Sequence, residues 1–205
     1  GYHYSDSIIY GFSHTHLSGT GVSDYGDILI MPTTGKLFLN NGADGKSGYS
    51  SRFSHKNETA KAGYYNVLLE DYNVFAELTT SQRVGFHKYT FNSGKEAQFI
   101  LDLEHRDRLT SSTIEMVNKN SIKGWRHSSN WATDQRLYFY IQLSENISEF
   151  VYREDSLVAG FKLGKIENPL LVKIGISAVS TENAKLNLET EIPHWDFNKT
   201  LDETT

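Results

Sequence analysis

Two histidines one residue apart, His14 and His16, stand in the stretch "GFSHTHLSGTG" among hydroxyl side chains and glycines. In an extended segment, side chains two residues apart point to the same face, so both imidazoles can serve one site. Such a site can hold a metal ion, bind a phosphate or bind a sugar. The glycines also fit a tight turn between strands, where they allow positive φ angles and close backbone approach. Each alternative requires different partner residues.

A metal site needs a third protein ligand beside the two imidazoles. No candidate stands at a fixed spacing from them, although four residues elsewhere are of the right type: His3, Asp24, Asp27 and His87. The chain has no cysteine, which excludes thiolate metal sites, disulfides and cysteine nucleophiles. We therefore expect no metal ion bound by this chain.

Phosphate binding and hydrolase chemistry find less support in the sequence. Gly19 and Gly21 lack the third glycine of a dinucleotide-binding loop, and a strand pattern rather than a helix follows them. Ser13 and Ser18 do not stand in a G-x-S-x-G nucleophile elbow. Among the 25 Asp and Glu residues, spacing marks no pair for glycoside hydrolysis, and we predict no catalytic residue in this chain.

A second polar stretch combines aromatic rings with hydrogen-bonding groups. "GWRHSSNWATDQ" contains Trp125, Arg126, His127, Asn130, Trp131 and Gln135. Sugar sites pair a flat apolar ring with short polar side chains, which makes Trp131 a candidate sugar contact. A tryptophan packed in the core or against another domain is the alternative, and composition alone favours that alternative.

Composition limits the classes of partner. The net charge is −5, and no run of Lys and Arg offers the clustered positive charge that nucleic acid requires. No apolar run approaches the length of a membrane span. The chain opens "GYHYSD" without Met and without a signal segment. We therefore expect its natural start to be truncated.

The elements that must position these residues are mostly strands. In "LVKIGISAV", Val172, Ile174 and Ile176 alternate with polar or small residues, and similar short patterns recur between turn signals along the chain. We predict an all-β antiparallel sandwich over residues 1–179. Ala184, Leu188 and Ile192 then repeat every four residues behind an N-cap at Ser180 or Thr181. Residues 180–205 are predicted to be a helical linker without a core of its own.

The opening stretch, together with "GYHYSD" and "YGDILIMP", resembles the N-terminal region of family 92 glycoside hydrolases. Further segments are similar to that family: "FSHKNETAKAGYYNVLL", "RVGFHKYTF", "WATDQ" and "VKIGISAVSTENAKLNLETEIPHWDF". The resemblance covers essentially the whole chain. It implies an N-terminal β-sandwich joined by helices to a C-terminal (α/α)₆ barrel, which is not in this chain.

The resemblance also implies an activity. Members of the family are calcium-dependent exo-α-mannosidases, so we expect an α-1,2-mannosidase that removes terminal mannose from glycans with inversion. A glutamic acid, an aspartate base and the Ca²⁺ ligands are expected in the barrel, and none of their motifs occurs here. The fragment alone is expected to be inactive. Export to the periplasm or cell surface of a bacterium is also implied.

Within this domain, the resemblance places the opening stretch at the interface with the barrel, where it shapes the mannose pocket. We predict that His14, His16, Thr20 and Trp131 bind substrate. A purely structural interface role is an equal alternative for the histidines. Two other functions stay open for the domain: a stand-alone carbohydrate-binding module and a scaffold that contributes packing alone.

Overall fold

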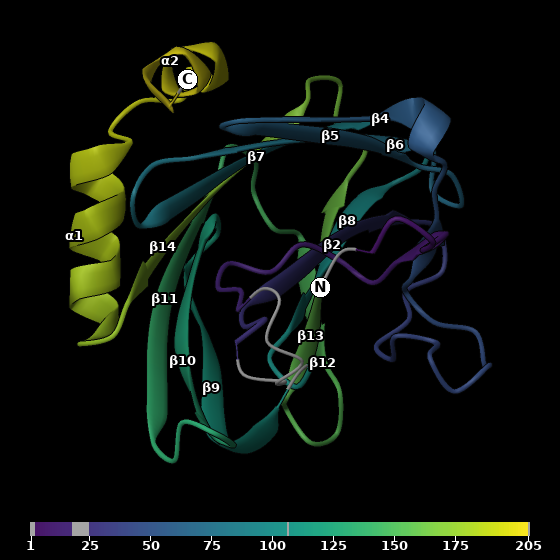
Figure 1. The fold of residues 1–205 in the computed structure, drawn as a ribbon. Helices are drawn as coiled ribbons and strands as arrows, with labels where there is room; N and C mark the ends of the chain where they lie inside the picture. Colours follow the sequence, from purple (N-terminus) through teal and green to yellow (C-terminus); the bar gives the residue numbers. More distant parts are fainter. Residues whose placement is uncertain (1–2, 18–24, 106, 205) are drawn as a thin grey trace.

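The computed structural model describes residues 3–17, 25–105 and 107–204. In these residues two antiparallel sheets face each other, as Figure 1 shows, with the two helices on the outer side of the larger sheet. This arrangement confirms the predicted all-β sandwich. None of the helices within the described ranges has the length and apolar character needed to cross a membrane.

The larger sheet contains eight described strands, and every neighbouring pair in it is antiparallel. Its spatial order is β4 (Glu58–Lys61), β5 (Tyr64–Leu69), β6 (Val74–Thr80), β7 (Val84–Phe91), β14 (Leu170–Ser177), β11 (Gln135–Leu143), β10 (Ser121–Ser129) and β9 (Arg108–Asn118).

The smaller sheet contains four described strands, in the order β12 (Glu149–Tyr152), β13 (Val158–Gly164), β8 (Ala97–Asp102) and β2 (Leu29–Thr34). A separate two-stranded ribbon pairs β1 (Ile8–Ile9) with β3 (Ser51–Arg52), and one 3₁₀ turn, η1, covers His55–Asn57.

The core between the sheets follows the alternation in the sequence. Val172 and Ile174 on β14 are fully buried in it, and Ile176 packs against its edge. Lys173, between them, points to the opposite face, where its ammonium group donates a 3.0 Å hydrogen bond to the carbonyl of Ile192. The sequence pattern is thus confirmed, and the outer face of β14 carries the helices.

Helix α1 (Thr181–Glu191) begins behind Ser180, whose hydroxyl accepts a 3.1 Å hydrogen bond from the Asn183 amide. Helix α2 (Phe197–Thr204) follows after a short turn. Both pack on the outer face of the large sheet through a second apolar cluster of Val84, Phe86, Tyr140, Ala184, Leu188, Ile192 and Phe197. The predicted helix is confirmed, but the segment does bury apolar surface, because outward residues of β7 and β11 are apolar. The division at residue 179 stays a prediction.

Candidate functional site

The described part of the stretch, residues 11–17, is an irregular segment. It is held by isolated bridges, Phe12 with Ile30 and His16 with Tyr25. Gly11 has φ +145°, and a Cβ atom there would lie 2.5 Å from the Leu29 side chain and 2.9 Å from the Ile30 carbonyl oxygen. A glycine is therefore required for this close approach. Gly19 and Gly21 lie outside the described residues.

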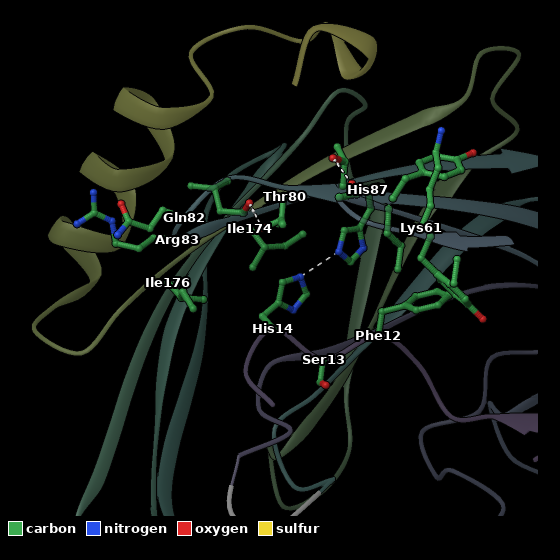
Figure 2. Close-up of a pocket in the computed structure, with 18 residues that line it drawn as sticks. Phe12, Ser13, His14, Lys61, Thr80, Gln82, Arg83, His87, Ile174 and Ile176 are labelled. Atoms are coloured by element: carbon green, nitrogen blue, oxygen red, sulfur yellow. Dashed lines mark hydrogen bonds between the residues drawn. The ribbon is translucent and has the colours of Figure 1, made fainter. Parts of the chain in front are cut away.

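His14 meets His87, which lies on β7 of the large sheet. Their Nε2 atoms are 3.1 Å apart, and the ring planes differ by 12° (Figure 2). The other nitrogen of His14 lies 2.6 Å from the Ile28 carbonyl oxygen. The other nitrogen of His87 lies 2.5 Å from the Tyr89 hydroxyl. All four ring nitrogens are thus engaged in hydrogen bonds.

These contacts fix the protonation of the pair. A carbonyl can only accept, so His14 must carry its proton on Nδ1, and the Nε2 of its neutral ring is an acceptor. His87 then donates from Nε2, and its Nδ1 accepts from Tyr89. Loss of hydration lowers the pKa of His14 to about 4, and burial beside His14 lowers the pKa of His87 well below its usual range. Both rings are neutral near pH 7.

The histidine pair lines a hollow of about 470 Å³ between the segment and the inner face of the large sheet. Figure 2 shows its wall, to which β5, β6, β7 and β14 contribute. Gly85 stands directly beside the pair, and a Cβ atom there would lie 2.8 Å from the His14 ring. A side chain at position 85 would therefore displace the imidazole.

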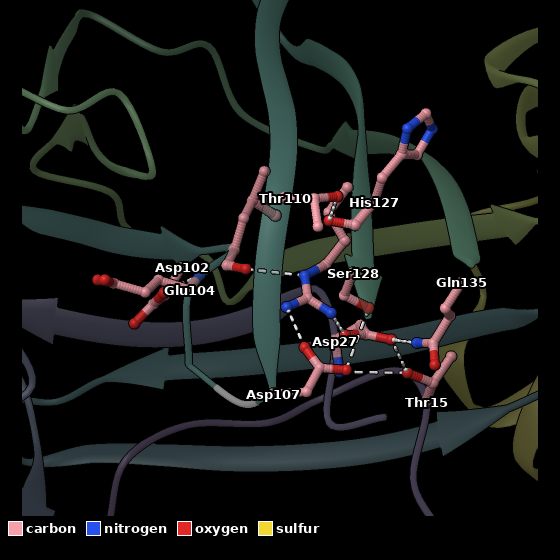
Figure 3. A network of polar contacts seen from close by, with 11 residues as sticks. Thr15, Asp27, Asp102, Glu104, Asp107, Thr110, His127, Ser128 and Gln135 are labelled. Atoms are coloured by element: carbon pink, nitrogen blue, oxygen red, sulfur yellow. Dashed lines mark hydrogen bonds and ion pairs between the residues drawn. The ribbon is translucent and has the colours of Figure 1, made fainter. Parts of the chain in front are cut away.

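A buried carboxylate, Asp27, anchors the segment from its other side (Figure 3). Its Oδ2 accepts hydrogen bonds from the Thr15 hydroxyl at 3.0 Å and from the Gln135 amide at 2.6 Å. The Asp27 backbone amide donates to the Thr15 hydroxyl oxygen, and the Asp27 carbonyl accepts from the His14 amide at 2.9 Å. Asp27 thus binds the segment through both its backbone and its side chain.

Arg126 on β10 neutralises that carboxylate. Its side chain is 1% exposed and forms ion pairs with Asp27 and with Asp107, the latter at 2.6 Å. Its Nε also donates to the Leu103 carbonyl at 2.8 Å. The Ser128 hydroxyl donates to the second oxygen of Asp107 at 3.1 Å. Burial lowers the pKa of Arg126 to about 10, so the guanidinium stays charged at neutral pH.

The other predicted substrate residues lie in different surroundings. His16 is exposed to solvent. Trp131 is 70% exposed in the loop between β10 and β11, four residues before Gln135. Thr20 lies outside the described residues. The structure therefore connects the His16 segment and the Trp131 loop through Asp27, while His14 faces the interior.

Metal ligands do not gather in the part of the chain that the structure describes. Within it, no three His, Asp or Glu side chains form a group that can hold an ion. Of the candidate third ligands, His87 and Asp27 contact the segment as hydrogen-bond partners, and Asp24 lies outside the described residues. These side chains do not fit a calcium site of their own.

Sequence reasoning missed Arg126 and Asp27 as a pair and considered His87 only as a possible metal ligand. A signal was present for Arg126, because the alternation of "SIKGWRHSS" places it on the buried face of the strand, with Ile122, Gly124 and Ser128. A charged side chain at a core position requires a buried partner. The partners, Asp27 and Asp107, are distant in sequence, so spacing could not identify them.

The fold defines an antiparallel two-sheet β-sandwich domain with an irregular segment bonded to its larger sheet. The sequence profile of the glycosyl hydrolase family 92 N-terminal domain matches residues 1–177. The chain belongs to this family and represents its N-terminal domain. No curated protein sequence matches the chain.

Solved structures agree with the family. A family GH92 α-mannosidase from Bacteroides thetaiotaomicron is 30% identical over 100% of this chain and 31% of its own length, with a TM-score of 0.87. A structure of that enzyme in complex with mannoimidazole gives the same TM-score and identity over 100% of this chain and 30% of its own length. A GH92 inverting mannosidase from B. thetaiotaomicron VPI-5482 shares the fold, with a TM-score of 0.84. It is 23% identical, and the match covers 99% of this chain and 28% of that enzyme. The chain thus spans less than a third of these relatives.

Proposed function

We propose that this chain is the N-terminal domain of an exo-α-mannosidase that removes terminal α-mannose, α-1,2-linked residues included, from glycans with inversion. Its partner is its own C-terminal (α/α)₆ domain, which completes the mannose pocket. Family membership supports this proposal, as does the similarity to α-mannosidases from Bacteroides thetaiotaomicron. The resemblance of the sequence also supports export to the periplasm or cell surface.

The main observation behind the proposed pocket-forming role is that hydrogen bonds from the sandwich hold an irregular segment in place. Residues 13–17 have little strand pairing, yet Asp27 and His87 hold their backbone and the side chains of His14 and Thr15. Because His16 is exposed to solvent whereas His14 contacts Ile28 and His87, His16 is the better candidate for contact with sugar hydroxyls. In this proposal His14 supports the segment, and His16, Thr20 and Trp131 face the substrate.

The acid, the base and Ca²⁺ belong to the C-terminal domain in this proposal. Inversion requires two carboxyl groups far enough apart to admit a water molecule. The largest buried carboxylate cluster described here, around Arg126, is closed by ion pairs and has no access to a substrate. The residues of this chain orient the sugar and exclude water from the pocket.

The activity is tested with the full-length protein on α-1,2-mannobiose. We expect release of mannose, with β-mannose as the first anomer seen by proton NMR. We also expect loss of activity in EDTA and recovery with Ca²⁺. Release of α-mannose first, or no release from any α-mannoside, would contradict the proposal.

The role of the two histidines is tested by His14→Asn and His16→Asn in the full-length protein. We expect His16→Asn to lower kcat/KM about three- to tenfold, the value of one hydrogen bond of about 0.5–1.5 kcal/mol, with little change in Tm. His14→Asn should lower Tm. If both variants keep kcat/KM within about twofold while Tm falls, the segment is only scaffold.

Autonomous carbohydrate binding is a second candidate function, and the exposed indole of Trp131 favours it. Calorimetric titration of mannobiose into residues 1–205 tests it. Binding that a Trp131→Ala variant abolishes would establish a binding module. If the titration shows no heat of binding at millimolar mannobiose, autonomous binding is ruled out and the pocket-forming role stands as the proposal.

A further inference from the structure

We propose that Arg126 is a positioning residue for substrate binding, acting through Asp27 and Asp107 to set three loops relative to one another. This inference rests on the proposed function, because two of the loops carry the proposed substrate contacts. The first loop is the segment that contains His16, and the second is the β10–β11 loop that contains Trp131. The third is the β8–β9 loop, described at residues 103–105 and 107.

Each loop is bonded to the cluster at its base. Thr15 of the first loop and Gln135, which closes the second, share the same oxygen of Asp27. Arg126 contacts both ends of the third loop, through the Leu103 carbonyl at one end and the Asp107 carboxylate at the other. Figure 3 shows these contacts converging from the three segments. A shift of the guanidinium would therefore move all three loops.

Loop positioning explains the cluster better than stability does. A buried ion pair is costly to desolvate, and well-packed apolar residues of similar size often stabilise a fold as much or more. The adjoining core is apolar, with Ile28, Leu103 and Leu137 buried, so apolar side chains that replaced Arg126 and both of its carboxylate partners together would suit these surroundings. The planar guanidinium instead offers five N–H donors in a fixed geometry, whereas an ammonium group offers three donors around a single nitrogen.

The test uses the full-length enzyme and a double-mutant cycle. Arg126→Lys keeps the positive charge but loses the planar arrangement of guanidinium N–H donors. It should lower kcat/KM on α-1,2-mannobiose about tenfold, mainly by raising KM. The same substitution is then made in a His16→Ala, Trp131→Ala background. If Arg126 acts through those two loops, its effect there should shrink to less than about threefold, since coupled sites are not additive.

Lys88→Met provides a matched control. Lys88 forms a 2.8 Å ion pair with Glu77 in the same sheet but on its outer face, beside Phe197. This variant should lower Tm without changing kcat/KM. The control thereby distinguishes the effect of losing an ion pair on Tm from the effect of displaced loops on kcat/KM.

The outcomes separate this inference from the proposed function. An Arg126→Lys variant with lower Tm and unchanged kcat/KM would overturn the positioning role, as would an equal loss of kcat/KM in both backgrounds. If Arg126→Lys does not fold, Arg126→Met combined with Asp27→Asn and Asp107→Asn removes the buried charges together and is put through the same cycle. The proposed function fails if the unmodified enzyme hydrolyses no α-mannoside or releases α-mannose first, whatever the effect of Arg126→Lys.

Discussion

At the scale of single residues, the structure places the two histidines predicted to bind substrate, His14 and His16, in different surroundings. The two ring nitrogens of His14 form hydrogen bonds with His87 and the Ile28 carbonyl, whereas His16 is exposed to solvent. The pair has room because Gly85 has no side chain. It also depends on the Tyr89 hydroxyl, which forms a hydrogen bond with His87. Neutral, mutually satisfied imidazoles rigidify a site without adding charge to it.

Gly85→Ala should destabilise the domain by about 1–3 kcal/mol, because the added methyl group overpacks the space beside the His14 ring. Urea unfolding measures the change. In a His14→Ala background the methyl group has room, so its cost should fall to less than half. An equal cost in both backgrounds would show that the strain lies in the strand and not in the imidazole pair.

The same pair should make stability depend on pH. The folded pKa of His14 is about 4, below its value of 6.5 without the surrounding protein. The unfolded chain therefore takes up the proton first as pH falls, and stability present above pH 6.5 is lost between pH 6.5 and 4. At pH 5 this loss should be about 2 kcal/mol for His14.

Urea unfolding at pH 7 and pH 5 checks this dependence. A His14→Asn, His87→Asn variant is the comparison, since titrating carboxylates elsewhere contribute equally to both proteins. The unmodified domain should lose more stability than the variant between the two pH values. Equal losses would mean that the pair is already protonated or solvated in the folded state.

At the scale of elements, the helices belong energetically to the sandwich. Ala184 and Leu188 of α1 are buried against the outer face of the large sheet, and Phe197 extends that contact at the start of α2. Lys173 reaches from β14 to the carbonyl of Ile192 and also lies 4.1 Å from the Trp195 ring centroid. A segment with these contacts folds with the sheet.

Two leucines of α1 test this statement. Leu188 is 1% exposed, and Leu188→Ala should cost about 2–5 kcal/mol of unfolding free energy. Leu186 is 58% exposed on the same helix, so Leu186→Ala should change stability by less than about 0.5 kcal/mol. Similar effects of both substitutions would mean that α1 is a loosely attached linker.

The sequence predicts elements whose residues interact locally. The alternation around Val172 and Ile174 indicates a strand, and Ser180 with Ala184 and Leu188 indicates the start and the buried face of a helix. It does not reveal what covers the outer face of the large sheet. Nor can it pair His14 with His87 or Asp27 with Arg126, because those contacts depend on how distant strands are arranged.

At the scale of the whole molecule, the chain corresponds to the N-terminal domain of its family. The chain spans 31% of the length of the α-mannosidase it matches at 30% identity. Its charged groups near the candidate site are paired: Asp27 and Asp107 with Arg126. The neutral histidines beside them carry no spare proton for transfer. We therefore expect catalysis to require the remaining two thirds of such a protein.

The corresponding prediction is that purified residues 1–205 release no mannose from an α-mannoside, with or without Ca²⁺. The physical reason is that the described carboxylates beside the segment, Asp27 and Asp107, are held in ion pairs with Arg126, and the described residues form no calcium site. Mannose release is measured by chromatography over hours at high protein concentration, with the full-length enzyme as the positive control. A matched sample with Arg126→Met guards against a contaminating hydrolase, whose activity would not change with the variant. Calcium-dependent release by the unmodified fragment, lost on this substitution, would place catalytic carboxylates in the sandwich and move Asp27 and Asp107 from support to chemistry.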